Sequence, residues 1–123
     1  FKLTKNKYLP LTIKGTSNLK PIKFFEKRGS AQCKSALIFA GMRTNGTTVI
    51  KAKKSRNHTE LLCKHLKLPI KVNKLKNYDL IKVKKIKKIN KLNYKIPSDI
   101  SSAAFFIVLT ALSKKSRLLI SIL

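Results

Sequence analysis

Short apolar runs alternate with helix-start signals along the chain, and this alternation limits the possible folds more than any other feature. Helix signals occur in residues 30–42, 57–66 and 100–112. Between them lie short apolar runs, of which 47–50 is entirely β-branched, as strands often are. The expected strands are 11–15, 21–25, 47–50, 70–72, 79–83, 92–96 and 118–123, with an exposed turn at 84–90. This order of elements predicts an α+β fold.

The helical period predicts which side chains the first two helices bury. In the first helix, the apolar residues at i, i+3, i+4 and i+7 are Cys33, Ala36, Leu37 and Ala40. In the second helix, the apolar face is Leu61, Leu62 and Leu66. Cys33 and Cys63 fall at apolar helix positions and outside any Cys-x-x-Cys pair. We therefore expect two free, buried thiols in a reducing compartment.

A weak internal repeat relates two of the expected helices. Ser35-Ala36 aligns with Ser102-Ala103 at an offset of 67 residues, and each copy reads as strand, tight loop, helix and strand. Stacked α+β modules are therefore expected within a single partial domain, 1–123. The chain starts at Phe1 rather than Met and ends in an apolar run without a turn signal. Both termini therefore look truncated.

The charge of the chain is strongly positive, with 29 basic and 4 acidic residues and a formal net charge of +25. Such a charge suggests nucleic-acid binding, because a basic face neutralises phosphates. Only four of the basic residues are Arg, however, and Arg is the residue that pairs bidentately with guanine. Lys, Ile and Asn share A/T-rich codons, so a biased genome would also produce this composition. A basic RNA- or DNA-binding module of ribosomal type remains the alternative function, and the short apolar runs do not favour a membrane binder.

Two helix starts offer hydrogen-bond donors to an anion. Gly29-Ser30 opens the first helix, where the first backbone N–H groups lack acceptors, and the Ser30 hydroxyl and Gln32 amide add donors. Arg56 stands just ahead of the second helix. The plainer interpretations are an ordinary Ser cap and a surface Arg beside a capped helix. The residues alone leave both interpretations open.

The sequence contains no visible set of residues for self-contained catalysis. Its four acidic residues form no obvious pair for acid–base work; they are Glu26, Glu60, Asp79 and Asp99. A serine triad, a P-loop and a dinucleotide fingerprint are missing, and the Cys and His residues do not make a zinc set. The residues therefore predict an α+β module with two candidate anion-binding helix starts, and no metal or cofactor.

Four stretches carry a resemblance to a known family, namely Leu9–Gly15, Gly29–Leu37, Arg56–Glu60 and Pro97–Phe105. In their order and spacing they resemble the 5-enolpyruvylshikimate-3-phosphate synthases (3-phosphoshikimate 1-carboxyvinyltransferases). The resemblance covers nearly the whole chain. One departure is Ser98, where the family usually has Gly before the Asp.

The resemblance implies a fold and a reaction. The family fold has two similar domains, each built from three βαβαββ units, and this chain would contain the end of one unit and most of the next. The family transfers the enolpyruvyl group of phosphoenolpyruvate to shikimate 3-phosphate and releases phosphate, without a metal or cofactor. Its partners are thus small-molecule substrates, and the full-length protein is expected to be a cytoplasmic monomer that does not bind a membrane.

The resemblance also implies roles for individual residues. Ser30 and the backbone N–H of Ala31 would hold the substrate phosphate together with Arg56, and Gln32 would contact the shikimate ring region and phosphoenolpyruvate. We therefore expect Ser30 and Arg56 on one open face. The catalytic acid and base of the family lie outside this chain, so no catalytic residue is expected here, and the fragment alone should be inactive.

Overall fold

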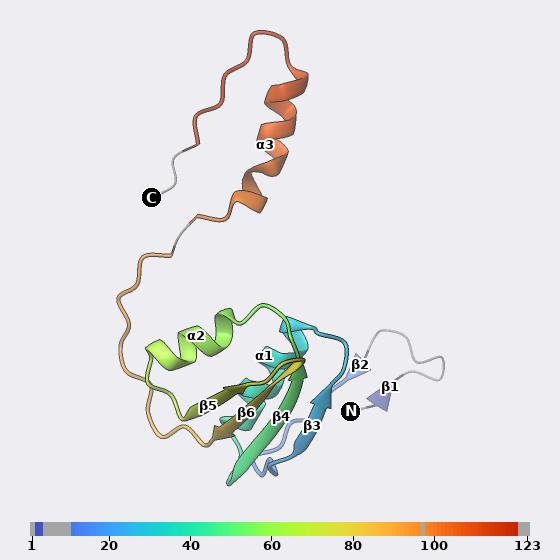
Figure 1. Ribbon diagram of the computed structural model, residues 1–123, viewed down its shortest axis with the longest axis vertical. Coiled ribbons are helices and arrows are strands. Elements are labelled where there is room, and N and C mark those ends of the chain that lie inside the picture. Colours follow the sequence, from blue (N-terminus) through green and yellow to red (C-terminus); the bar gives the residue numbers. More distant parts are fainter. Residues whose placement is uncertain (1, 4–10, 97, 121–123) are drawn as a thin grey trace. The chain divides into compact units, whose positions relative to one another are not determined.

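The computed structural model describes residues 2–3, 11–96 and 98–120, which form a mixed α/β structure (Figure 1). Its elements are β1 (Lys2–Leu3), β2 (Leu11–Thr12), β3 (Lys23–Glu26), α1 (Ala31–Gly41), β4 (Thr47–Lys53), α2 (His58–His65), β5 (Ile70–Lys74), β6 (Tyr78–Lys84) and α3 (Ile100–Leu112). The chain divides into two compact units, residues 1–90 and 91–123. All the strands and the first two helices belong to the first unit, and α3 belongs to the second.

The main sheet has four strands in the order β3-β4-β6-β5, and β1 pairs with β2 in a separate antiparallel ladder. β3 runs parallel to β4, whereas β6 runs antiparallel to both of its neighbours. Parallel strands need a long crossover connection, and α1 and α2 lie in the connections β3-α1-β4 and β4-α2-β5. Residues 23–84 therefore follow the order β-α-β-α-β-β.

Both α1 and α2 pack on the same face of this sheet. The buried core combines side chains of both helices with inward-facing side chains of β4 and β6; its members are Ile38, Met42, Ile50, Ala52, Cys63, Ile81 and Val83. The antiparallel register sets Ile50 opposite Ile81. Cross-strand pairs of this kind are the main unit of sheet stabilisation.

The opposite face of the sheet carries a cation between aromatic rings. Lys51 Nζ lies 4.7 Å from the centre of the Phe25 ring and 4.1 Å from the centre of the Tyr78 ring. The negative faces of the rings attract the ammonium group.

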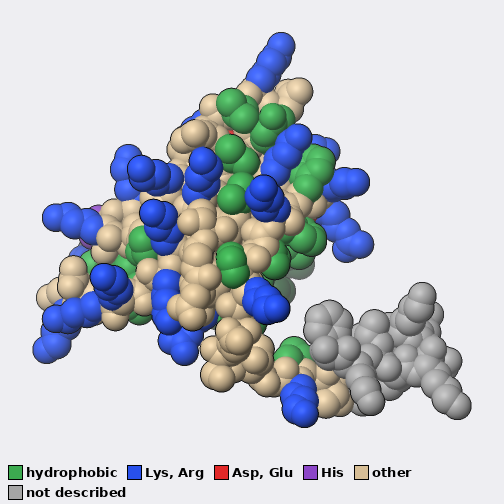
Figure 2. Space-filling model, turned by 90° about the horizontal axis from the view of Figure 1, so that it is seen from below, with side chains coloured by type: hydrophobic (Ala, Val, Ile, Leu, Met, Phe, Trp, Pro, Cys, Tyr) green, Lys and Arg blue, Asp and Glu red, His purple; other side chains and the backbone are tan. Residues whose placement is uncertain are grey.

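The basic residues are spread over the surface rather than gathered in one stripe. On the face drawn in Figure 2, Lys and Arg side chains stand out on all sides, with hydrophobic side chains visible between them. Among the Lys residues whose side chains are described, only Lys34 is buried. The excess of Lys thus falls almost wholly on solvated positions.

The predicted buried faces of α1 and α2 are wrong at most positions, although Leu37 packs against the core and Cys63 is buried as expected. In α1 the buried residues are Lys34, Ile38 and Gly41, so Cys33 is exposed and the expectation of a buried thiol fails there. Gly41 explains part of this orientation of α1, because the helix approaches β4 closely there. A Cβ at position 41 would come within 3.0 Å of Thr48 Cβ. In α2 the buried residues are Glu60 and Cys63, whereas Leu61 and Leu62 are exposed.

Several predicted elements differ from the observed ones. Residues 92–96 form no strand, nor do residues 118–120, while 121–123 lie outside the described residues. The predicted strand 11–15 shortens to Leu11–Thr12. Because no strand precedes α3 in the second unit, the strand-loop-helix-strand copy expected there is not found among the described residues. Within the described residues, segments 92–96 and 118–120 have no partner strand, which a local pattern cannot supply.

Helix α3 begins and ends where the sequence predicts. Asp99 caps it, accepting a hydrogen bond from the Ser101 N–H at 2.9 Å. None of its side chains is buried within the described residues. With 13 residues, it falls short of the about 20 that a bilayer span requires, and no other described helix is long and apolar enough to cross a membrane.

The two thiols differ in surroundings, and this difference predicts their reactivity. Burial, and then the charge of Glu60, raise the pKa of the Cys63 thiol. Because the thiolate is the reactive form, Cys63 in the native protein should react with iodoacetamide at pH 8 at least about tenfold more slowly than in urea. Raising the pH should increase the native rate. Mass spectrometry of the peptide that contains Cys63 measures both rates; equal labelling in the two states would contradict the buried site.

Candidate functional site

The start of α1 is built by a serine cap. Ser30 is the N-cap residue, with φ −85° and ψ 116°, and its Oγ accepts a hydrogen bond from the Cys33 N–H at 3.2 Å. The hydroxyl also donates to Gln32 Oε1 at 3.4 Å. The backbone N–H groups of Ala31 and Gln32 belong to the first turn, where a helix provides no acceptor. These two groups are the donors that α1 can offer to an anion.

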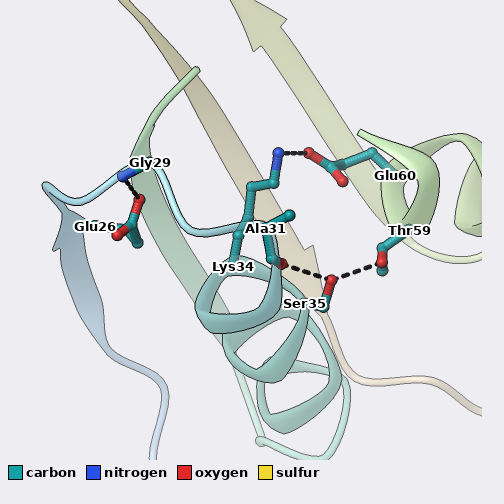
Figure 3. A network of polar contacts seen from close by, with 7 residues as sticks. All are labelled: Glu26, Gly29, Ala31, Lys34, Ser35, Thr59 and Glu60. Carbon is teal, nitrogen blue, oxygen red and sulfur yellow. Dashed lines mark hydrogen bonds and ion pairs between the residues drawn. The ribbon is translucent and has the colours of Figure 1, made fainter. Parts of the chain in front are cut away.

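A buried carboxylate holds the loop that leads into α1. Glu26 is 3% exposed and accepts hydrogen bonds from the backbone N–H groups of Arg28 and Gly29, both at 2.8 Å. Figure 3 shows the contact with Gly29. Gly29 has a φ of 74°, in the left-handed region that favours glycine. A Cβ at this position would also lie 3.3 Å from the Lys54 carbonyl oxygen. The loop is therefore fixed in a conformation that only glycine adopts easily.

An open groove of about 450 Å³ runs between the starts of α1 and α2. Its lining residues are Ala31, Gln32, Ser35, Ala36, Phe39, Arg56, His58 and Thr59. Three of the four residues predicted to bind substrate thus share one surface, and Ser30 precedes Ala31 directly. Whether they bind a ligand stays a prediction. Sequence reasoning assigned no role to Ser35 or Thr59, because their contact joins two helices that are separated along the chain.

The groove has a positive character. Arg56 is exposed, and the N-terminal ends of α1 and α2, which carry partial positive charge, both reach the groove. None of the lining residues is acidic. The nearby carboxylates are engaged elsewhere: Glu26 accepts the loop N–H groups, and Glu60 pairs with Lys34. The arrangement suits a phosphate or carboxylate ligand better than a cation.

Two contacts join the first turns of α1 and α2 beside the groove (Figure 3). Lys34 Nζ lies 2.6 Å from Glu60 Oε1, and both side chains are almost fully buried. Ser35 Oγ lies 2.6 Å from Thr59 Oγ1 and donates to the Ala31 carbonyl oxygen at 2.8 Å. Neither contact could be predicted from sequence patterns, because both connect residues of different helices.

The described part of the chain contains few residues suited to acid–base catalysis or metal binding. Asp79 is buried, and its Oδ1 lacks a hydrogen-bond partner there. It lines a separate cavity of about 260 Å³ with Asn57, Glu60, Leu61, Lys64, Ile70, Val72 and Lys74. Asp99 caps α3 in the other unit. The described residues include no group of three or more His, Cys, Asp or Glu suited to a metal ion.

Comparisons with known proteins all point to one family. A family model described as EPSP synthase (3-phosphoshikimate 1-carboxyvinyltransferase) matches residues 2–121. The 3-phosphoshikimate 1-carboxyvinyltransferase of Caldicellulosiruptor bescii is 44% identical over 119 residues, which cover 96% of this chain and 27% of that protein. The enzyme of the same name from Thermotoga sp. (strain RQ2) is 39% identical over 122 residues, 98% of this chain and 28% of the relative. A Staphylococcus aureus (strain JH9) relative is 42% identical over 110 residues, 89% of this chain and 25% of its own length.

Substitution of Ser30 should separate its capping role from any role in binding. Ser30→Ala removes the side chain that accepts the Cys33 N–H and should lower the free energy of unfolding by about 1 kcal/mol, whereas Ser30→Gly should cost only a few tenths. Urea denaturation of the three proteins measures both changes. Equal losses for Ala and Gly would contradict the cap.

Proposed function

The chain belongs to the EPSP synthase family, and on this premise we propose that the protein transfers the enolpyruvyl group of phosphoenolpyruvate to shikimate 3-phosphate. The chain spans about a quarter of the length of the curated relatives that it matches. Its own part in the reaction is to supply a section of the shikimate 3-phosphate site. The rest of the site, including the catalytic residues, belongs to other parts of the protein.

The groove between α1 and α2 is the observation that carries this proposal. It brings the first-turn residues Ala31 and Gln32 to the same surface as Arg56. Two helix N-termini and one guanidinium would stabilise the dianionic phosphate through charge-assisted hydrogen bonds. The Ser30 hydroxyl stands at the edge of this cradle, and the Gln32 amide would reach the ring of the substrate or phosphoenolpyruvate.

The arrangement of the carboxylates supports an assignment of the acid–base chemistry to other parts of the protein. No acidic side chain lines the groove. Glu26 and Glu60 are occupied by structural contacts, so neither is free to move a proton at the substrate. Within this chain we therefore assign binding residues only: Ser30, Ala31, Gln32 and Arg56.

The element order supports a module of the enolpyruvyl transferase fold. The β-α-β-α-β-β order of residues 23–84 fits one βαβαββ unit, and the β1–β2 ladder fits the end of the unit before it. Residues 1–123 would then be part of one of two similar domains. A cytoplasmic, monomeric full-length protein is the accompanying proposal.

Nucleic-acid binding, the alternative that the net charge of +25 suggests, gains no support from the family comparisons. The scattered positions of the Lys side chains in Figure 2 also give no continuous stripe for a phosphate backbone on that face. The two functions can be separated by comparing one Arg with two surface Lys residues.

Arg56→Ala should weaken shikimate 3-phosphate binding by about 10- to 150-fold, because a charge-assisted hydrogen bond contributes about 1.5–3 kcal/mol. Lys84→Ala and Lys87→Ala remove the same charge from exposed positions that do not line the groove. Screening by salt over about 8 Å should make their effects small. Titration calorimetry on the full-length protein measures all three dissociation constants.

The same variants test the alternative. A nucleic-acid module would bind RNA tightly, and each Lys substitution would reduce the slope of affinity against salt by about one. Equal and small effects of all three substitutions on shikimate 3-phosphate, together with salt-sensitive RNA binding, would contradict the proposed function.

A further inference from the structure

We propose that Lys34 and Glu60 are positioning residues: their buried ion pair fixes the distance between the start of α1 and the start of α2, and thereby the spacing of the phosphate cradle. The inference rests on the proposed function, because it takes the groove as the phosphate site. Neither residue lines the groove. Both act through the residues that do, namely Ala31 and Gln32 on α1 and Arg56 ahead of α2.

The geometry of the pair is suited to this role. Lys34 lies one turn into α1, and Glu60 lies in the first turn of α2. Their charged atoms are 2.6 Å apart, and their side chains are 1% and 5% exposed. Beyond this contact, neither charged group has a hydrogen-bond partner in the described part of the chain. Each charged group therefore relies on the other as its partner. If the two helix starts separated, each buried charge would be left unpaired in an apolar environment.

A chain of hydrogen bonds continues the connection to the groove itself. Ser35 donates its only hydroxyl proton to the Ala31 carbonyl oxygen, so Thr59 is the donor in the 2.6 Å contact between the two hydroxyl groups. The chain thus runs from α2 through Ser35 to Ala31. Figure 3 shows this chain and the ion pair side by side between the two helices. Two neighbouring contacts resist both separation and sliding of the helix starts.

The pair has a second effect on an incoming anion. Glu60 alone would place a negative charge near a dianionic phosphate and weaken its binding. Lys34 cancels that charge at a distance of 2.6 Å. A test of positioning must therefore remove both charges together, because removal of Lys34 alone would change the electrostatic field as well as the geometry.

The test is a set of four proteins, each in full-length form: the parent, Lys34→Met/Glu60→Leu, Arg56→Ala, and the protein with all three changes. Apolar residues of similar volume often replace a buried ion pair without loss of stability, so the melting temperature of the pair variant should stay near that of the parent. Its dissociation constant for shikimate 3-phosphate should rise by about tenfold. In the Arg56→Ala background the same pair change should alter the constant by less than about twofold, because the guanidinium whose position matters is gone.

The outcomes separate this inference from the proposed function. If Arg56→Ala weakens binding and the pair change weakens it equally in both backgrounds, or not at all, the positioning role is wrong and the binding site stands. If Arg56→Ala leaves the affinity unchanged, the binding site and the positioning role both fail. If the pair change weakens binding in the parent but hardly at all in the Arg56→Ala background, the binding site and the positioning role are both supported.

A second variant covers a failure of the pair variant to fold. Thr59→Val keeps the side-chain volume and removes the hydrogen bond to Ser35. It should weaken shikimate 3-phosphate binding several-fold in the parent and much less in the Arg56→Ala background. Thr47→Val is the matched control, because Thr47 is an exposed residue of β4 outside the groove. An uncoupled effect of Thr59→Val, or the same effect from Thr47→Val, would overturn the inference.

Discussion

The burial of one ion pair decides how the two helices lie on the sheet. An unpaired charge in the interior costs several kcal/mol, so Lys34 and Glu60 must face each other once the helices cover the sheet. This requirement fixes the rotation of α1 about its axis: Lys34, Ile38 and Gly41 turn inward, and Cys33 turns outward. The close approach of Gly41 to β4 favours the same orientation of α1, because only a residue without Cβ fits there comfortably.

The same pair shows why some features could be predicted from the sequence and others could not. Helix starts depend on a few neighbouring residues, so the Gly-Ser signal before α1 and the Asp99 cap of α3 identified them well. The buried face of a helix depends on its partners. An apolar period counts Lys34 as a solvent residue, and nothing near it in sequence reveals Glu60 as its partner 26 positions later. The prediction of a strand at 92–96 was wrong for a related reason, since this segment has no partner strand among the described residues.

The candidate site likewise has some features that could be predicted from the sequence and others that could not. The positions of Ser30 and Arg56 at two helix starts could be predicted, because each follows from local signals. The groove is also lined by Ser35 and Thr59, which only the packing of α1 beside α2 brings together. The scattered surface Lys residues, by contrast, contribute most of the charge and little of the architecture.

The contacts of Glu26 bear on where an exchangeable anion can sit. Its carboxylate already accepts hydrogen bonds from the backbone N–H groups of Arg28 and Gly29. These two donors are therefore occupied by a carboxylate that belongs to the chain itself. A diffusing phosphate gains nothing by competing there, because a tethered group has a far higher effective concentration. Further along the chain, the backbone N–H groups of Ala31 and Gln32 lie in the first turn of α1, where the helix provides no acceptor. In the proposed site, the internal carboxylate of Glu26 would therefore leave the start of the helix, rather than this part of the loop, to bind the phosphate.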